Sequence, residues 1–295
     1  MENNNIKGHL AALVTIIIWG TTFISTKVLL ESFSPVLILF LRFIIGLAVL
    51  FIVCPGRLYV KNKKEELVFA LSGLCGICLY YLLENIALTY TMASNVGVII
   101  SAAPFFTAVL SQIFMKKQEH LNINFFTGFI ISMAGICLIS FNGTDLKLNI
   151  TGDILALAAA FVWAVYSLLS KITGSYGYNI IKSTRRTFTY GIIFMLPALF
   201  FTGFKMDTRG FTNVKYLLNL VFLGAGASAM CFVTWNYAVK ILGAVKTSIY
   251  IYIVPVVTVL ASVAILHEKI TIIPAAGIVL VLAGLIISGK NSKSS

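Results

Sequence analysis

Ten apolar runs, most of them about twenty residues long, follow one another along the chain and leave few choices of fold. A helix that crosses the hydrocarbon core of a bilayer needs about twenty apolar residues, whereas the strands of a membrane barrel alternate apolar and polar positions. The runs do not alternate, so they predict an all-α polytopic membrane protein with ten transmembrane helices. They lie at residues 9–30, 35–53, 67–90, 93–115, 123–141, 152–172, 180–202, 216–240, 244–266 and 271–289.

The composition agrees with a membrane protein. The 295 residues are 59% hydrophobic and 11% charged, and a soluble domain of this length needs more charge on its surface. The net charge is +12, but the basic residues cluster in short segments between apolar runs. Charges in such places set the orientation of a membrane protein. We therefore expect the lipid bilayer, and no nucleic acid, as a partner.

The two halves of the chain resemble each other. Residues 80–104 (YYLLENIALTYTMASNVGVIISAAP) align without a gap with residues 231–255 (CFVTWNYAVKILGAVKTSIYIYIVP), and residues 9–27 resemble residues 153–171. The matched pairs are Trp19 with Trp163, Lys27 with Lys171, Arg42 with Arg186, Asn85 with Asn236, Pro104 with Pro255, Gly128 with Gly277 and Gly135 with Gly284.

Each half holds five predicted crossings. Because five is odd, the second half enters the bilayer upside down, as in many secondary transporters whose site lies at the midplane between inverted repeats. We expect one membrane domain with repeats at residues 1–142 and 143–295.

The basic residues also predict the orientation. With the N-terminus in the cytoplasm, thirteen Lys and Arg fall in inside segments and six in outside segments, which favours cytoplasmic termini. The inside residues are Lys7, Arg57, Lys61, Lys63, Lys64, Lys116, Lys117, Lys171, Lys182, Lys240, Lys246, Lys290 and Lys293, and the outside ones are Lys27, Lys147, Lys205, Arg209, Lys215 and Lys269.

Glu84 is the acidic residue that falls deep inside a predicted span. A charge there costs a few kcal/mol, so it should face a cavity or a partner. Such a carboxylate could take up and release a proton near neutral pH or hold a substrate amine. The alternative is a structural role, bonded to a tyrosine hydroxyl or paired with Arg42. Tyr80 and Tyr81 precede Glu84 by four and three residues and share its helix face.

Aromatic and small polar side chains on other spans are candidates for the same cavity. Trp19 and Trp163 hold matching positions in the two halves, and Trp235 falls on Glu84. Their rings could hold apolar or cationic parts of a substrate, or they could serve in packing or an interfacial belt. The other candidate lining residues are Thr22, Asn95, Ser101, Tyr166, Ser248 and Tyr250.

Three further features favour structural roles at least as strongly as functional ones. Asn85 and Asn236 are expected to bridge helices through hydrogen bonds. Pro104 and Pro255 predict kinks in matching spans, for gating or for packing alone. We expect Arg42 to snorkel to an interface or to form an ion pair, in preference to binding an anion.

No pattern predicts an enzyme. The chain lacks a GxxxxGK[ST] loop and an HExxH helix, and Cys75-x-x-Cys78 has no second Cys or His pair nearby. We therefore expect no catalytic residue, no metal and no cofactor.

Taken together, these residues resemble the drug/metabolite transporter superfamily, in particular its EamA-type ten-helix members. The resemblance covers nearly the whole chain. It is carried by Trp19-Gly20 with Lys27, Leu41-Arg42-Phe43, Pro104, Glu119, Gly128 and Gly135, and in the second half by Pro255, Glu268, Gly277 and Gly284.

The resemblance implies a secondary transporter of the bacterial inner membrane, often an exporter of amino acids or other small metabolites. It further implies alternating access, with a cavity lined by helices 1, 3, 4, 6, 8 and 9. The role of Glu84 is not carried over from the family. We expect an exporter of amino acids or of amphipathic or cationic compounds, acting as a monomer or weak dimer, with protons as candidate coupling ions. The alternatives are an uncoupled facilitator, a membrane enzyme and an assembly subunit.

Overall fold

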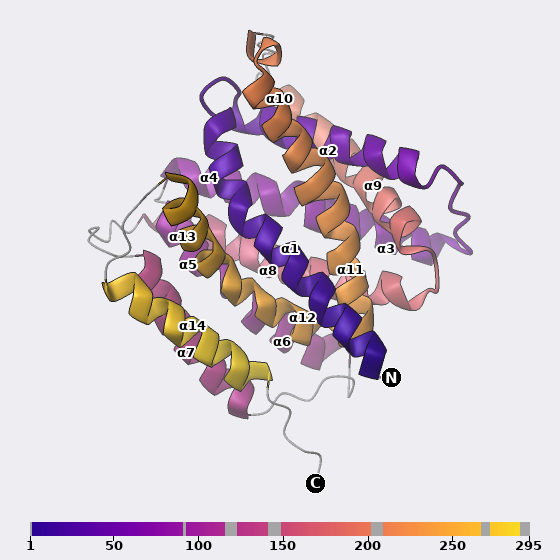
Figure 1. Ribbon diagram of the computed structural model, residues 1–295. Helices are drawn as coiled ribbons and strands as arrows, with labels where there is room; N and C mark the ends of the chain where they lie inside the picture. Colours follow the sequence, from indigo (N-terminus) through magenta and orange to yellow (C-terminus); the bar gives the residue numbers. More distant parts are fainter. Residues whose placement is uncertain are drawn as a thin grey trace.

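The structure is a computed structural model that describes residues 2–90, 93–115, 123–140, 149–201, 209–266 and 272–289. Within these residues it contains helices and no strand, which confirms the all-α prediction. The helices form ten rods packed into one bundle (Figure 1). Seven of the described helical segments are long and apolar enough to cross a bilayer, and two shorter apolar helices accompany them.

The ten predicted spans correspond to the ten rods, some of which are divided. The first half consists of α1 (Glu2–Leu29), α2 (Pro35–Val53), α3 (Lys63–Gly73) with the π-helix η1 (Leu74–Leu79) and α4 (Tyr80–Tyr90), α5 (Ala93–Ile100) with α6 (Ala103–Phe114), and α7 (Ile123–Ser140). The second half consists of α8 (Ile150–Ser175), α9 (Ile180–Phe201), the 3-10 turn η2 (Arg209–Thr212), α10 (Val214–Val221) with the π-helix η3 (Phe222–Met230) and α11 (Cys231–Leu242), α12 (Ala244–Ser248) with the 3-10 turn η4 (Ile249–Tyr252) and α13 (Ile253–Leu266), and α14 (Ile272–Gly289).

The contacts between the halves occur in exchanged pairs. α1 packs against α11 and α13, and its counterpart α8 packs against α4 and α6. α2 packs against η3 as α9 packs against η1, while α7 pairs with α14. A two-fold relation between the halves produces this pattern. Since each half has five rods, equivalent rods run in opposite directions, as inverted repeats require.

The packing of α2 and α9 corrects one detail of the repeat. A Cβ added at Gly224 would meet the carbonyl oxygen of Arg42, and one added at Gly73 would meet that of Thr187. Because Gly73 and Gly224 are themselves equivalent, the counterpart of Arg42 is Thr187 and not Arg186. Counted from the matched tryptophans, α2 starts 16 residues after Trp19 and α9 starts 17 residues after Trp163, so the second half has one extra residue before α9.

Glycines let α7 and α14 pack closely at one side of the bundle (Figure 1). A Cβ at Gly135 would lie 2.6 Å from the carbonyl oxygen of Gly277, and a Cβ at Gly277 would lie 2.6 Å from that of Gly135. Gly128 and Gly284 meet in the same way. These glycines therefore allow the two helices to approach closely.

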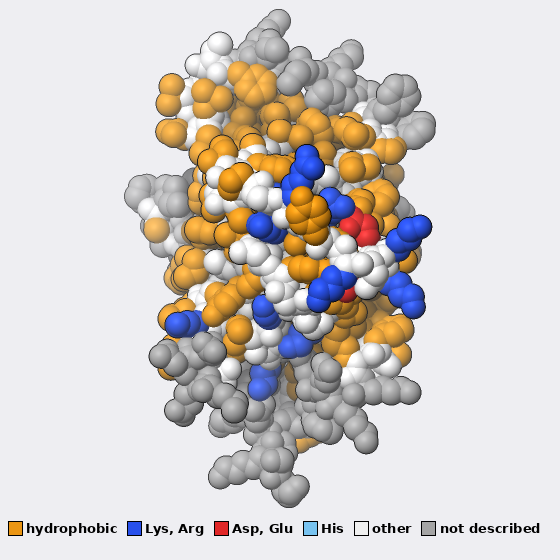
Figure 2. Space-filling model, turned by 90° about the vertical axis from the view of Figure 1, so that its right-hand side faces the viewer, with side chains coloured by type: hydrophobic (Ala, Val, Ile, Leu, Met, Phe, Trp, Pro, Cys, Tyr) orange, Lys and Arg blue, Asp and Glu red, His pale blue; other side chains and the backbone are white. Residues whose placement is uncertain are grey.

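One end of the bundle is basic. Figure 2 views the molecule from the right-hand side of Figure 1 and shows Lys and Arg side chains gathered over this end. The exposed basic residues there are Lys7 near the start of α1, Arg57 and Lys61 in the α2–α3 connection, and Lys63 and Lys64 at the start of α3.

Several predictions from the sequence lie outside the described residues. They concern the repeat boundary at 142/143, the Glu119 and Glu268 turns, and the charges at Lys116, Lys117, Lys147, Lys205, Lys269, Lys290 and Lys293.

Candidate functional site

The three tryptophans meet between the two halves. The ring of Trp19 on α1 lies 5.4 Å from that of Trp163 on α8 and 5.2 Å from that of Trp235 on α11, between centroids. Trp163 and Trp235 are 6.0 Å apart. Both of these are buried and Trp19 is partly buried, so the described structure does not place them in an interfacial belt.

Tyrosines of α4 extend this aromatic cluster into the first half. The ring of Tyr80 lies 4.8 Å from that of Trp163 and 4.8 Å from that of Tyr81. Tyr81 lies 5.2 Å from Phe43 on α2. The repeat-related pair of Tyr81 and Phe43 is Phe232 and Phe188, whose rings are also 5.2 Å apart. This part of the cluster therefore follows the two-fold relation, except that Tyr81 in the first half has a hydroxyl group that Phe232 in the second half lacks.

Arg42 lies against this cluster, which corrects the expectation that it would snorkel or form an ion pair. The residue is 8% exposed, because α2 packs against η3 of the other half. Its Nε donates to Ser228 Oγ at 2.9 Å, and its Cζ lies 5.1 Å from the centroid of Tyr81. Neither of the ion pairs found among the described residues includes it.

Glu84 follows Tyr80 by one helical turn on α4 and is partly buried. Its carboxyl group lies near the positive charge of Arg42 and within hydrogen-bonding reach of the Tyr80 hydroxyl. The side chain therefore faces the interior of the bundle. In the described structure no direct ion pair joins Glu84 to Arg42. A carboxyl group and a guanidinium thus lie near each other without a direct ion pair among the described residues.

Two buried donors in the cluster find no partner among the residues that the structure describes. The indole Nε1 of Trp19 donates to the carbonyl oxygen of Ala227 at 3.0 Å. The Nε1 atoms of Trp163 and Trp235 are buried and make no hydrogen bond within the described part of the chain. Unpaired buried donors are rare in proteins and call for an explanation.

Asn236 bridges three helices, as predicted. Its side-chain oxygen accepts from Tyr166 Oη at 2.8 Å and from Ser170 Oγ at 2.7 Å, and its Nδ2 donates to Thr184 Oγ1 at 3.0 Å. Tyr166 still contributes its ring, whose centroid is 5.2 Å from that of Trp163. The repeat mate Asn85 has no such set of partners among the described residues.

The smaller polar candidates do not converge on the cluster through hydrogen bonds. Thr22 donates to Trp19 O at 2.7 Å, Ser101 to Gly97 O at 2.7 Å and Ser248 to Val245 O at 2.8 Å, each within its own helical segment. The side chain of Asn95 lies outside the described residues.

Tyr250 lies apart from the tryptophans. Its hydroxyl meets His9 Nδ1 at 2.7 Å. His9 precedes Trp19 by ten residues on α1, a distance of about 15 Å along a helix. Tyr250 is therefore closer to the end of the bundle than to its centre.

Pro104 and Pro255 coincide with interruptions of their rods. α5 ends at Ile100 and α6 starts at Ala103, with Pro104 in its first turn. The 3-10 turn η4 precedes α13, whose first turn holds Pro255. Proline has no backbone N–H to donate, and its ring clashes with the carbonyl group four residues earlier. These two effects account for both breaks.

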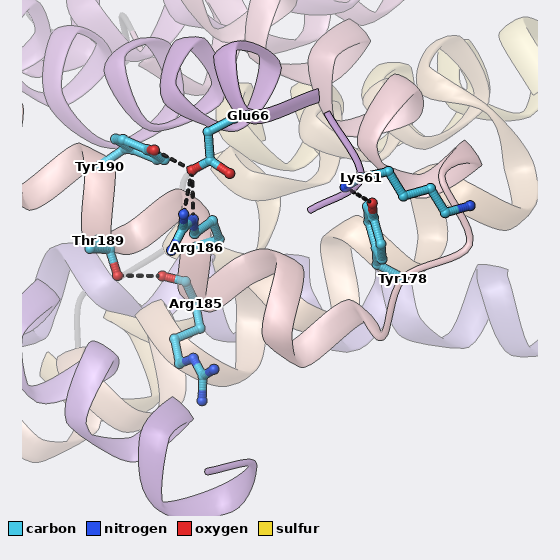
Figure 3. A network of polar contacts seen from close by, with 7 residues as sticks. All are labelled: Lys61, Glu66, Tyr178, Arg185, Arg186, Thr189 and Tyr190. Atoms are coloured by element: carbon cyan, nitrogen blue, oxygen red, sulfur yellow. Dashed lines mark hydrogen bonds and ion pairs between the residues drawn. The ribbon is translucent and has the colours of Figure 1, made fainter. Parts of the chain in front are cut away.

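A polar network ties the halves together at the basic end (Figure 3). Glu66 on α3 pairs with Arg186 at 2.6 Å and accepts from Tyr190, both on α9. Arg185 donates to the carbonyl oxygens of Gly56, at 2.6 Å, and Cys54. The sequence alone does not indicate this network. Glu66 lies in the first turn of α3, where acidic residues are common because they stabilise the helix N-terminus, so its position does not point to a partner on α9.

Tyr178 belongs to the same end, in the connection between α8 and α9. It donates to Glu65, and its hydroxyl accepts from the backbone N–H of Lys61 at 2.9 Å. Desolvation and the Glu65 carboxylate raise the pKa of the Tyr178 phenol, so the hydroxyl remains a neutral donor.

The opposite end carries the repeat-related contact. Tyr216 on α10 donates to Glu31 at 3.1 Å, and Lys215 lies 3.8 Å from the same carboxylate. Both ends of the bundle are therefore closed by polar contacts between an element of one half and an element of the other.

Comparison with known proteins matches this architecture to a family of transporters. The model of the EamA-like transporter family matches residues 6–141 and 150–289. An uncharacterized transporter of Archaeoglobus fulgidus is 29% identical over 95% of this chain and 96% of its own length. The uncharacterized transporter YvbV of Bacillus subtilis is 28% identical over 95% of this chain and 90% of its own length.

Two further comparisons agree with this match. A probable terminal-alkyne amino-acid exporter of Streptantibioticus cattleyicolor is 25% identical over 96% of this chain and 93% of its own length. A crystal structure at 20% sequence identity has the same fold, with a TM-score of 0.78 over 95% of this chain and 96% of the other. The chain is thus a polytopic membrane transporter and not an enzyme. Because the family model matches both halves, the protein belongs to the EamA-like transporter family.

Proposed function

We propose that this protein is a secondary active transporter that exports a small metabolite, such as an amino acid or an amphipathic or cationic compound, by alternating access. The observation that carries the proposal is the cluster of three tryptophans between the halves, which Tyr80 and Tyr81 connect to Glu84 and Arg42. In inverted-repeat transporters the substrate site lies at this position. Rings of this kind can flank an apolar or cationic substrate.

Glu84 is the proposed coupling residue. An ionisable group inside a membrane protein is costly and is retained for a functional reason in most cases. Its carboxylate can hold either a proton or a substrate ammonium group, and the two compete for the same oxygens. Inward movement of a proton would therefore be linked to outward movement of the substrate. The remaining candidate is a facilitator, in which Glu84 only holds the substrate.

We further propose that the basic end of the bundle faces the cytoplasm of a cell whose inner membrane holds the protein. Figure 2 shows that Lys and Arg gather there, and such residues are retained on the cytoplasmic side. The start of α1 lies at this end (Figure 1), which accords with a cytoplasmic N-terminus. Ten crossings return the C-terminus to the same side.

Flux from proteoliposomes tests the coupling role. Vesicles would be loaded with the twenty standard amino acids and a set of small alkylamines, and efflux would be followed by mass spectrometry with and without a pH gradient. We expect the gradient to accelerate the efflux of at least one compound several-fold. The Glu84→Gln variant should fold but lose this response.

Glu65→Gln, in the first turn of α3 and outside the Glu66–Arg186 pair, is the matched control and should retain a response to the gradient. Flux that ignores the gradient in the unmodified protein would identify a facilitator. Undiminished gradient-driven flux in the Glu84→Gln variant would refute the coupling role of Glu84.

A further inference from the structure

We propose that Arg42 binds the carboxylate of the transported molecule, so that the substrate is a small zwitterion and not a simple cation. This inference rests on the proposed transport function and concerns the same site between the halves. It assigns a role in specificity to a residue that lies beside Glu84 but belongs to another helix.

The first observation is the free part of the guanidinium. Nε of Arg42 donates to Ser228 Oγ at 2.9 Å, which fixes the plane of the group. The two terminal nitrogens make no hydrogen bond to any described residue. The edge formed by these two nitrogens is therefore free. It matches the geometry of a carboxylate, which can accept two parallel hydrogen bonds.

The second observation is the contrast with the arginines of α9. The Arg186 side chain is 40% exposed and pairs directly with Glu66, and Arg185 donates to two carbonyl oxygens. Arg42 is 8% exposed and has neither kind of partner among the described residues. A buried charge without a direct counter-charge is strongly unfavourable, and a bound carboxylate would supply that counter-charge.

The third observation concerns the charge balance of the site. Glu84 and Arg42 lie near each other without a direct ion pair between them, and together they are neutral when both are ionised. A zwitterion that inserts its ammonium group toward Glu84 and its carboxylate toward Arg42 brings no net charge into the bundle. A simple amine would meet the like charge of Arg42, and a simple carboxylate would meet that of Glu84.

The fourth observation is the pair of unused indole donors. The Nε1 atoms of Trp163 and Trp235 need acceptors that the described residues do not supply. A carboxylate has about four acceptor positions, of which a guanidinium uses two. The remaining positions are available to donors of the aromatic cluster, whose rings would cover the apolar body of the substrate.

Tryptophan fluorescence provides a direct test of binding. The chain has three tryptophans, and all of them lie in the cluster, so a change in emission reports on this site. The probes are matched pairs that differ only in the carboxylate: alanine and alaninamide, leucine and leucinamide, lysine and lysinamide. In at least one pair the acid should bind roughly 10- to 100-fold more tightly than the amide.

Variants connect this preference to Arg42. Arg42→Gln should abolish the preference for the acid over the amide, and Arg42→Lys should restore part of it. Ser228→Ala, which keeps the charge but frees the plane of the guanidinium, should reduce the preference by a few-fold. Arg186→Gln is the matched control and should leave the preference unchanged.

Two results would overturn the inference. The first is equal binding of acid and amide, or no binding of any acid, by the unmodified protein. The second is a full preference for the acid in the Arg42→Gln variant. Efflux of amides or alkylamines as fast as amino acids would also refute it while leaving the transport function intact, whereas efflux of none of the compounds would refute the transport function itself.

Discussion

At the scale of residues, the repeat keeps the aromatic positions of the centre and changes the charged ones. Phe43 and Phe188 are equivalent, and Tyr81 corresponds to Phe232. Glu84, in contrast, corresponds to Trp235 in the second half, and it lies one helical turn from Tyr80 of the cluster. The charged side chains of the site therefore come from the first half, and the second half supplies the rings and indole N–H groups of Trp163 and Trp235.

Asn236 allows a stability prediction at this scale. Asn236→Ala removes the acceptor of Tyr166 and Ser170 and the donor to Thr184. We expect the free energy of unfolding to fall by about 1–2 kcal/mol, the range of interhelical hydrogen bonds in membranes. Steric trapping in bicelles can measure this change.

The repeat mate gives the matched control for this measurement. Asn85→Ala should lower the free energy of unfolding by less than half as much, because Asn85 has no comparable set of partners among the described residues. Equal losses in the two variants would show that the bridge through Asn236 does not stabilise the bundle.

Part of the site could be predicted from the sequence. Tyr80, Tyr81 and Glu84 share one helix face, and the repeat relates Trp19 to Trp163, so their helical spacing and pairing point to a common region. The position of Arg42 could not be predicted in this way. Its surroundings depend on the packing of α2 against η3 and on a one-residue shift, and neither is encoded in local sequence.

At the scale of elements, the interruptions of the central rods lie beside the site. The π-helices η1 and η3 directly precede α4 and α11, which carry Glu84 and Trp235. π-helical turns are frequent at functional sites. Proline predicts the breaks in the fourth and ninth rods, but no residue type marks a π-helix, so η1 and η3 could not be predicted from the sequence.

The α7–α14 contact gives a prediction for packing. In the Gly135→Ala variant the new methyl group would lie 2.6 Å from the Gly277 carbonyl oxygen. Because backbone atoms cannot move aside easily, the free energy of unfolding should fall by about 1–3 kcal/mol, the usual cost of overpacking. Thermal unfolding in detergent provides a rapid first measurement.

Gly97→Ala is the control for this substitution. A Cβ at Gly97 has nothing within 4 Å, and alanine favours a helix over glycine by up to about 1 kcal/mol. The variant should be as stable as the unmodified protein or more stable. An unchanged melting temperature in the Gly135→Ala variant would show that α7 and α14 are farther apart than described.

At the scale of the whole molecule, the two halves are joined at both ends around the central cluster. Glu66 and Arg186 close the basic end (Figure 3), and Glu31 and Tyr216 close the other. Alternating access requires that one set of contacts breaks while the other holds. The two-fold pattern of packing makes these two arrangements similar, since the main helix pairs of one half have counterparts in the other half.

The accessibility of position 84 tests the account most directly. In a variant without its native cysteines, Glu84→Cys would be treated in sealed vesicles of each orientation with a membrane-impermeant thiol reagent. We expect labelling from both sides, and protection by an amino acid that the unmodified protein transports. Labelling by a lipid-soluble reagent alone would show that position 84 faces lipid, and would contradict a water-accessible site between the two halves.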